Sequence, residues 1–401
     1  MIRPATIDDL EPLLTLEERC FATDRISRRR FRHLLTRAKA RTLVEDEGGR
    51  LLGYALVLFS RGTALARLYS IAVDAEARGR GIARRLLAAA EAEAVARGCV
   101  SMRSEVRRDN TASLALFRSN GYRQFDEVED YYEDHMDALR FERTLAPQLE
   151  LTSVRVPYYP QTTDFTCGPA CLMMAMKALE PQLHLDRRLE LRLWRESTSI
   201  FMTSGQGGCG PFGLAVAAHE HGFDAELFVK QRGPFLAETV RHPAKKEVIR
   251  IVEEDYLDRI GELGIPVHRR PARFPEVQEL FEAGGIPLVL ISSWRIYRER
   301  FPHWVVITGF EERFIYAHDP FVDSSEGETV ADCVNMPIAR AEFERMARYG
   351  RSGQRAVLVV WPRRRSHGSQ VRPSRGRPKA ASTRRSGGGE AAPADDSIQA
   401  R

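Results

Sequence analysis

One stretch in the first third of the chain constrains the fold more than any other. Residues 68–73 form a short apolar run typical of a strand, and a loop with two glycines follows it. This loop opens a predicted helix whose apolar residues recur at helical spacing, at Ile82, Leu86, Leu87, Ala90 and Ala94. The first N–H groups of a helix lack partners and lie at the positive end of its dipole, so this order of elements predicts a phosphate site.

The loop carries the pattern Arg-x-x-Gly-x-Ala at Arg78, Gly81 and Ala83. Glycine lets a ligand approach the backbone closely because it has no Cβ. The pattern lacks the Gly-Lys-Ser/Thr of a Walker loop and the third glycine of a dinucleotide fold. It resembles the acetyl-CoA pyrophosphate loop of the GCN5-related N-acetyltransferases. The alternative is that the glycines only make the turn and the arginines face water.

This resemblance extends over residues 1–145, which we expect to form one α/β domain with a mixed sheet. It implies acetyl-CoA as the cosubstrate. The residues that it assigns to acetyl-CoA are Ile71 and Val73 on the strand, Arg78, Gly79, Arg80, Gly81, Ile82 and Ala83 in the loop, and Asn110 further on. For Asn110 the alternative is a simple helix cap, because it precedes a predicted helix over 111–120.

The sequence Ser-Glu-Val-Arg at 104–107 is similar to the branch of this family that acts on protein N-termini, typified by the ribosomal-protein-alanine acetyltransferases. The resemblance assigns Glu105 as the general base, which the chemistry needs because a protonated amine cannot attack a thioester. The alternative is an ordinary strand glutamate in a salt bridge. Where that branch has a tyrosine acid this chain has Phe117, so Tyr122, Tyr131 or Tyr132 is expected to replace it, or the thiolate leaves unassisted.

A second site is predicted near the start of the second half of the chain. Cys167 begins an apolar helical run, where the helix dipole favours the thiolate, and Gln161 lies six residues upstream. In papain-like enzymes this spacing lets a glutamine side chain and the cysteine N–H form an oxyanion hole. Cys171, one turn further along, is expected to be a core residue.

A histidine and an aspartate complete this second set. His303 opens one predicted strand, Asp319 ends the next, and the turn between them is centred on Glu311, which would pair the two residues directly. His318 would then point to the other face as a structural histidine. Gln161, Cys167, His303 and Asp319 in this order resemble the bacteriocin-processing branch of papain-like peptidases, with Asp319 orienting His303.

The domain order follows from these motifs and from the charge. We predict an acetyltransferase domain at 1–145, a linker at 146–153, a papain-like α+β domain at 154–362 and a disordered basic tail at 363–401. The tail holds ten Lys/Arg and three Asp/Glu, a net +7 against +5 for the whole chain, so the rest is −2. The positive charge is therefore no sign of a folded nucleic-acid surface, and no specific nucleic acid is expected.

The remaining features set the expected location and partners. The six cysteines are scattered and no run of 18 apolar residues occurs, which predicts reduced thiols, no membrane and a cytoplasmic location. No cysteine and histidine spacing suggests a metal. The expected partners are a peptide or protein N-terminus as acetyl acceptor and a peptide substrate for the second domain.

The sequence thus predicts a bifunctional enzyme, an N-acetyltransferase joined to a thiol peptidase-like domain. Two alternatives stay open. The first domain could sense acetyl-CoA and regulate the second, or the second could hold peptides without cleaving them.

Overall fold

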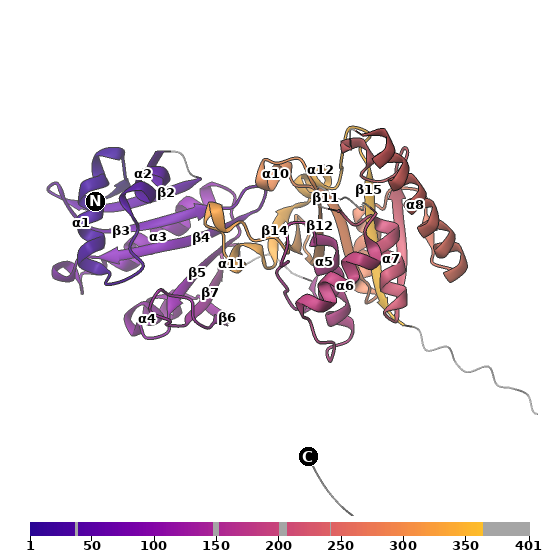
Figure 1. The fold of residues 1–401 in the computed structure, drawn as a ribbon. Coiled ribbons are helices and arrows are strands. Elements are labelled where there is room, and N and C mark those ends of the chain that lie inside the picture. The colour runs from indigo at the N-terminus through magenta and orange to yellow at the C-terminus, as the bar shows by residue number, and fades with distance from the viewer. Residues whose placement is uncertain (37–38, 147–151, 200–206, 241, 364–401) are drawn as a thin grey trace, which may run out of the picture. The chain divides into compact units, whose positions relative to one another are not determined.

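Alternate residues of the central strands in the first domain enter two different apolar cores. In β3 (Arg50–Phe59), Tyr54 and Leu56 pack in the core that contains α1 (Leu10–Cys20) and α2 (Arg28–Thr36). Ala55 and Val57 pack in the core that contains α3 (Ile82–Ala96) and α4 (Thr111–Ser119). Helices therefore cover both faces of this sheet (Figure 1). The computed structural model describes residues 1–36, 39–146, 152–199, 207–240 and 242–363.

The first domain is an α/β unit with a mixed sheet, as the sequence predicted. A seven-stranded sheet has the order β1-β2-β3-β4-β5-β7-β6 and is mixed, because only β4 and β5 run parallel. The other elements are β1 (Ile2–Pro4), η1 (Ile7–Asp9), α1 (Leu10–Cys20), α2 (Arg28–Thr36), β2 (Ala40–Glu47), β4 (Leu65–Val73), η2 (Ala75–Ala77), α3 (Ile82–Ala96), β5 (Ser101–Arg107), α4 (Thr111–Ser119), β6 (Arg123–Val128) and β7 (Ala138–Thr144).

Strands β4 and β5 pair over three residues only and then part. Leu65, Ala66 and Arg67 lie opposite Ser101, Met102 and Arg103, and beyond them no pairing joins the two strands in the part of the chain that the structure describes. The Ser104 hydroxyl donates to the Leu68 carbonyl (3.0 Å) where they separate. The sheet thus has a fork, whose open end lies toward the loop that starts α3.

The second domain is an eight-stranded sheet with the order β10-β9-β15-β11-β12-β13-β14, and β8 pairs with β12. Helices α5, α6 and α7 lie together in its main core with this sheet. The elements are β8 (Thr152–Ser153), α5 (Cys167–Leu179), α6 (Arg187–Ser197), α7 (Pro211–Glu220), β9 (Phe223–Lys230), η3 (Ala237–Thr239), α8 (Pro243–Leu263), β10 (Val267–His268), α9 (Phe274–Glu282), β11 (Ile286–Ser292), α10 (Trp294–Tyr297), β12 (Pro302–Phe310), β13 (Phe314–His318), η4 (Ser324–Glu326), α11 (Val330–Cys333), β14 (Met336–Ala339), α12 (Arg340–Met346) and β15 (Arg355–Pro362).

The register predicted for the β12–β13 hairpin is wrong. Val306 lies opposite His318 and Phe310 opposite Ile315, with a bulge between Ile307 and Gly309. The turn is centred later than Glu311, because the Glu311 N–H donates to the Phe314 carbonyl (2.9 Å). The shift is by two positions, which keeps each side chain on its face and makes positions 303 and 319 diagonal neighbours.

The two sheets are parts of one compact unit, Met1–Arg363. A small apolar cluster joins them through Ala64, Val100 and Phe314, and the Ala64 N–H donates to the Pro337 carbonyl (2.7 Å). Thr152 and Ser153, which the sequence placed in the linker, pair with β12. The predicted tail, apart from Arg363, lies outside the described residues.

Candidate active sites

The loop before α3 presents open backbone amides. Gly79 and Gly81 have φ of 77° and 73°, a left-handed conformation that glycine adopts without strain. Among the described residues, no acceptor lies on the N–H groups from Gly79 to Arg84. A Cβ at Gly79 would meet nothing within 4 Å. These amides at the N-terminus of a 15-residue helix fit a diphosphate.

The arginines of this loop are exposed, and two of them form ion pairs at the surface. Arg80 pairs with Glu47 (2.8 Å) and Arg85 with Glu45 (2.5 Å), so part of the loop's positive charge is already balanced. The N–H groups, and not these side chains, are therefore the open donors of the loop.

Ile71 and Val73 lie on the part of β4 that has left β5, beside the fork. The backbone edge of β4 at these residues can therefore accept an extended ligand arm. The Val73 carbonyl already has one contact, because the Cys20 thiol lies 3.5 Å from it. Asn110 caps α4, since its Oδ1 accepts from the Ser113 N–H (3.0 Å). Its contact with a CoA arm stays a prediction.

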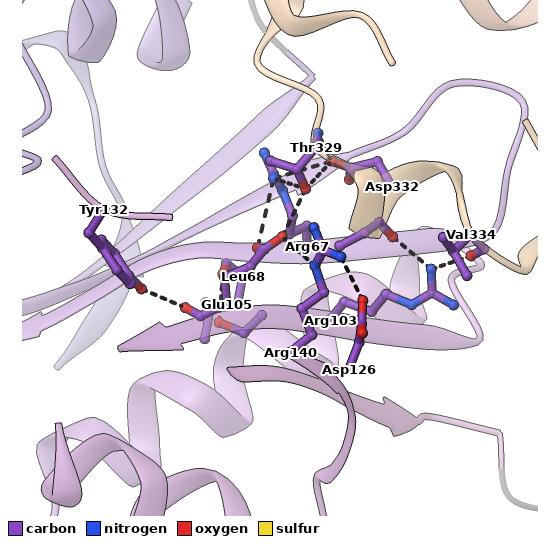
Figure 2. Close-up of polar contacts among 12 residues, drawn as sticks. Arg67, Leu68, Arg103, Glu105, Asp126, Tyr132, Arg140, Thr329, Asp332 and Val334 are labelled. Atoms are coloured by element: carbon purple, nitrogen blue, oxygen red, sulfur yellow. Dashed lines mark hydrogen bonds and ion pairs between the residues drawn. The ribbon is translucent and has the colours of Figure 1, made fainter. Parts of the chain in front are cut away.

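Glu105 lies at the fork in a closed polar cluster (Figure 2). Its side chain is 6% exposed, and its Oε1 accepts from the Thr329 hydroxyl of the second domain (2.8 Å). The guanidinium groups of Arg67 and Arg140 lie 3.8 Å from its carboxylate. Both sequence readings of Glu105 thus have support, because the group is central to the fork and ion-paired.

Phe117, which has no proton to transfer, is a core residue. It is buried and contacts Tyr122 edge to face, with ring centroids 4.9 Å apart. Tyr131 and Tyr132 instead lie at Glu105, whose charge adds to burial in raising the pKa of both phenols. The Tyr132 hydroxyl reaches the Glu105 carbonyl at 3.5 Å. Of the three tyrosines expected to replace the acid, these two have the better position.

In the second domain, Cys167 is the first residue of α5 and is partly exposed. Thr166 precedes it and is fixed by Glu190, whose Oε1 accepts from the threonine hydroxyl (2.5 Å). Among the described residues no acceptor lies on the Cys167 N–H. The thiol therefore lies beside an open amide at a positive helix end.

His303 and Asp319 contact each other as predicted, despite the changed register. His303 Nε2 lies 2.6 Å from Asp319 Oδ1, and both side chains are buried. Burial lowers the pKa of His303, but the Asp319 carboxylate and a hydrogen bond with Cys167 raise it to about 10. The structure thus brings Cys167, His303 and Asp319 together, with Nδ1 of the imidazole left for the thiol.

Sequence reasoning missed the residues that hold Asp319. The Tyr297 hydroxyl donates to Asp319 Oδ2 (2.8 Å) and the Phe321 N–H to Oδ1 (2.9 Å), while the Tyr158 hydroxyl donates to the Asp319 carbonyl (2.8 Å). Burial raises the pKa of both tyrosines, so each stays a donor. No sequence signal marks Tyr297, because it lies on the one-turn helix α10.

Gln161 lies next to this triad but not in an obvious oxyanion position. Its N–H donates to the Pro320 carbonyl (2.8 Å) and its Nε2 to the Thr163 carbonyl (2.9 Å). Its Oε1 is buried and has no partner in the described part of the chain. The amide has a second Nε2 proton to offer, so the oxyanion role stays a prediction.

Two other residues have the structural roles that were expected. His318 is buried between the Val156 carbonyl and the Asn335 N–H (both 2.8 Å), and burial lowers its pKa to about 4. Cys171 is fully buried. Within the described ranges, no group of three or more metal-ligating side chains converges, and no helix is long and apolar enough to cross a membrane.

Known proteins resemble each half of the chain separately. Residues 156–361 match the model of the Peptidase_C39 like family, and residues 7–122 match the acetyltransferase (GNAT) family. Comparison with curated proteins gives no match. Similar solved structures include the ribosomal-protein-S18-alanine N-acetyltransferase from Escherichia coli (25% identity, 36% of this chain and 94% of that one, TM-score 0.34) and the ribosomal-protein-alanine N-acetyltransferase from Brucella melitensis (27%, 36% and 99%, TM-score 0.33).

Proposed function

The chain belongs to the Peptidase_C39 like family and carries a GNAT acetyltransferase domain, and from this we propose that it is a bifunctional enzyme. The first domain transfers an acetyl group from acetyl-CoA to the α-amino group of a peptide or protein. The second cleaves a peptide with a Cys-His-Asp triad. The observation that carries the first half is the fork of β4 and β5, which opens toward the free amides of the loop from Gly79 to Ala83.

In the first domain, the loop amides would hold the diphosphate and the β4 edge at Ile71 and Val73 the pantetheine arm. When bound, acetyl-CoA supplies a thioester that an unprotonated amine can attack. Glu105 takes the proton from the acceptor ammonium, directly or through water. Tyr131 or Tyr132, both beside Glu105, would return a proton to the leaving thiolate.

In the second domain, the Cys167 thiolate attacks the carbonyl carbon of a peptide bond. The protonated His303 gives its proton to the departing amine, which leaves an acyl thioester on Cys167. A water then attacks this thioester, with His303 as base, and the acid product leaves. Asp319 keeps the imidazole oriented, and the Cys167 N–H with the Gln161 amide stabilises the oxyanion.

One experiment tests both halves. Thiol release from acetyl-CoA is measured with peptides of varied N-terminus, and cleavage of the same peptides is followed in parallel. Glu105→Gln is expected to lower acetyl transfer by about 100-fold and to leave cleavage unchanged, since the removal of a general base costs on that order. Cys167→Ala is expected to do the reverse. Wild-type protein that binds acetyl-CoA without thiol release contradicts the transferase.

Binding of acetyl-CoA without thiol release would favour the alternative that the first domain is an acetyl-CoA sensor. The closed cluster around Glu105 is the observation in favour of a sensor, since this side chain is only 6% exposed and its Oε1 already accepts from Thr329. A second domain that only holds peptides is tested by alkylation of Cys167 with iodoacetamide near neutral pH, because an unactivated thiol reacts slowly.

A further inference from the structure

Residues 327–335 of the second domain, here called the cover segment, lie on the acetyltransferase fork. Arg67 of β4 donates to the Gly327 carbonyl (2.6 Å) and to the Thr329 hydroxyl (2.8 Å), and it pairs with Asp332 (3.2 Å). The Arg67 side chain is only 2% exposed. Figure 2 shows the contacts of Arg67 with Thr329 and Asp332 at the fork.

A second arginine on the neighbouring strand holds the other end of the cover segment. Arg103 lies opposite Arg67 in the β4–β5 pairing, and it donates to the carbonyls of Ala331 (2.7 Å) and Val334 (2.5 Å). Its side chain is 3% exposed. Hydrogen bonds from charged groups are stronger than neutral ones, so two buried arginines bind the cover segment specifically.

The cover segment also occupies the position that an acceptor needs. The Thr329 hydroxyl donates to Glu105 Oε1 (2.8 Å), which is the kind of contact that an acceptor ammonium makes with its base. The Thr329 hydroxyl therefore competes with an acceptor amine for this oxygen, on a side chain that is only 6% exposed. Asp332 meanwhile forms an ion pair with Arg67. Without Asp332, the Arg67 guanidinium would keep only the Glu105 carboxylate as an ion-pair partner among the described residues.

The other side of the cover segment is bonded to the triad. The Asp319 N–H donates to the Cys333 carbonyl (2.9 Å), and the Cys333 thiol lies 3.3 Å from the Phe321 carbonyl. The same nine residues therefore contact Glu105 in one site and Asp319 in the other. A movement of the cover segment that takes Thr329 away from Glu105 therefore also alters the hydrogen bond between the Asp319 N–H and the Cys333 carbonyl.

We propose that the cover segment is an autoinhibitory lid, which closes the acceptor end of the acetyltransferase site until it is displaced. This inference rests on the proposed acetyl transfer. The lid ties the two sites together, because a peptide bound near Asp319 acts on the chain that covers Glu105. Acetyl transfer is therefore slow in the closed state, while the loop from Gly79 to Ala83 stays open to acetyl-CoA.

The test weakens the lid in the full chain. Thr329→Val removes the hydroxyl from Glu105, and Asp332→Asn, as a second variant, removes the charge that pairs with Arg67. Glu342→Gln is the matched control, since it removes one carboxylate of a similar arginine pair inside the second domain (2.5 Å from Arg295). Three quantities are measured: hydrogen exchange in residues 327–335, affinity for acetyl-CoA, and kcat/KM for acetylation of a peptide.

We expect faster exchange in the cover segment and at least a 10-fold rise in kcat/KM with both variants, at unchanged acetyl-CoA affinity, and no change with Glu342→Gln. Unchanged exchange, or faster exchange without faster acetylation, overturns the lid. A fall in kcat/KM also overturns it and makes Thr329 a positioning residue for Glu105. If wild type and variants bind acetyl-CoA but none acetylates, the proposed transferase fails, and the lid with it.

Discussion

Two buried carboxylates, Glu105 and Asp319, anchor the two candidate sites, and they differ in where their partners come from. Asp319 accepts from His303, Tyr297 and the Phe321 N–H, all in its own domain. Glu105 accepts its hydroxyl from Thr329, which belongs to the other domain. The triad is thus complete within one domain, whereas the environment of Glu105 depends on how the two domains meet.

This difference teaches what each site needs in order to act. Under the proposed function, the triad would need only a peptide, because Cys167, His303 and Asp319 already contact one another. Under the proposed lid, the fork would need both acetyl-CoA and the removal of the cover segment from Glu105. Substitutions in the triad should therefore lower the rate of peptide cleavage directly. Substitutions at the fork should instead change the affinity for acetyl-CoA or the access of the acceptor to Glu105.

The largest effect is expected from Asp319→Asn. Without the carboxylate, the pKa of His303 falls from about 10 toward its usual value and the imidazole loses its orientation. Cleavage by the wild type should persist up to about pH 10, because the His303 imidazolium that protonates the departing amine is retained up to its pKa. In Asp319→Asn we expect cleavage to fall by about 10³-fold and the basic fall of its pH profile to move below pH 10.

The control for Asp319→Asn is Glu226→Gln, which removes the carboxylate of another histidine pair, 2.8 Å from His268. It should change neither the pH profile nor cleavage. An Asp319→Asn protein with the wild-type profile would show that Asp319 does not support the base.

Tyr297→Phe sharpens the comparison by removing one partner of Asp319 only. The lost hydrogen bond (2.8 Å) goes to a charged group, so about 10-fold in kcat/KM for cleavage is expected, with acetyl transfer unchanged. Tyr256→Phe is matched, since it removes a hydroxyl that donates to the Glu196 carbonyl (2.8 Å). Equal rates for Tyr297→Phe and Tyr256→Phe would mean that the Tyr297 contact has no catalytic value.

Gly79→Ala tests whether the loop before α3 binds acetyl-CoA. At φ 77° an alanine strains the loop by about 1 kcal/mol, so the affinity for acetyl-CoA should fall about 5-fold by calorimetry. Gly98→Ala is the control, because Gly98 also has a positive φ (81°) and open space around its Cβ position, but it lies past the end of α3. The same loss in both variants would mean that the loop amides do not bind the diphosphate.

The smallest effect concerns Glu328, on the cover segment. Burial, then Asp332 and Asp319, raise the pKa of its carboxyl to about 8. The unfolded chain loses this proton near pH 4.5, so stability falls as the pH rises from that value to about 8 and then levels. Glu328→Gln should reduce the loss of Tm between pH 5 and 8 by roughly 5 °C. The exposed Glu312→Gln should not, and identical Tm curves for the two variants would contradict the raised pKa.

The sequence predicted most of the fold because its signals are local. The glycine loop at Gly79 and Gly81 and the helix that starts at Cys167 are set by neighbouring residues, and both occur as expected. The His303–Asp319 contact was also predicted, although the register was wrong, because a bulge near Thr308 cannot be read from alternation alone.

The rest of the site could not be predicted, because it depends on contacts between residues far apart in the chain. Thr329 lies 224 positions from Glu105, and no spacing links them. Tyr297 reaches Asp319 from a one-turn helix without a periodic signal. Phe117 was identified as a departure, but only its burial against Tyr122 shows that the residue belongs to the core.

The central claim, two separate active sites in one chain, is tested most directly by mass spectrometry of a long peptide incubated with the full chain and acetyl-CoA. The account predicts cleaved products with acetyl groups on their new α-amines for the wild type. It predicts cleavage without acetylation for Glu105→Gln, and acetylated but uncut peptide for Cys167→Ala. Loss of both products in either single variant would contradict it.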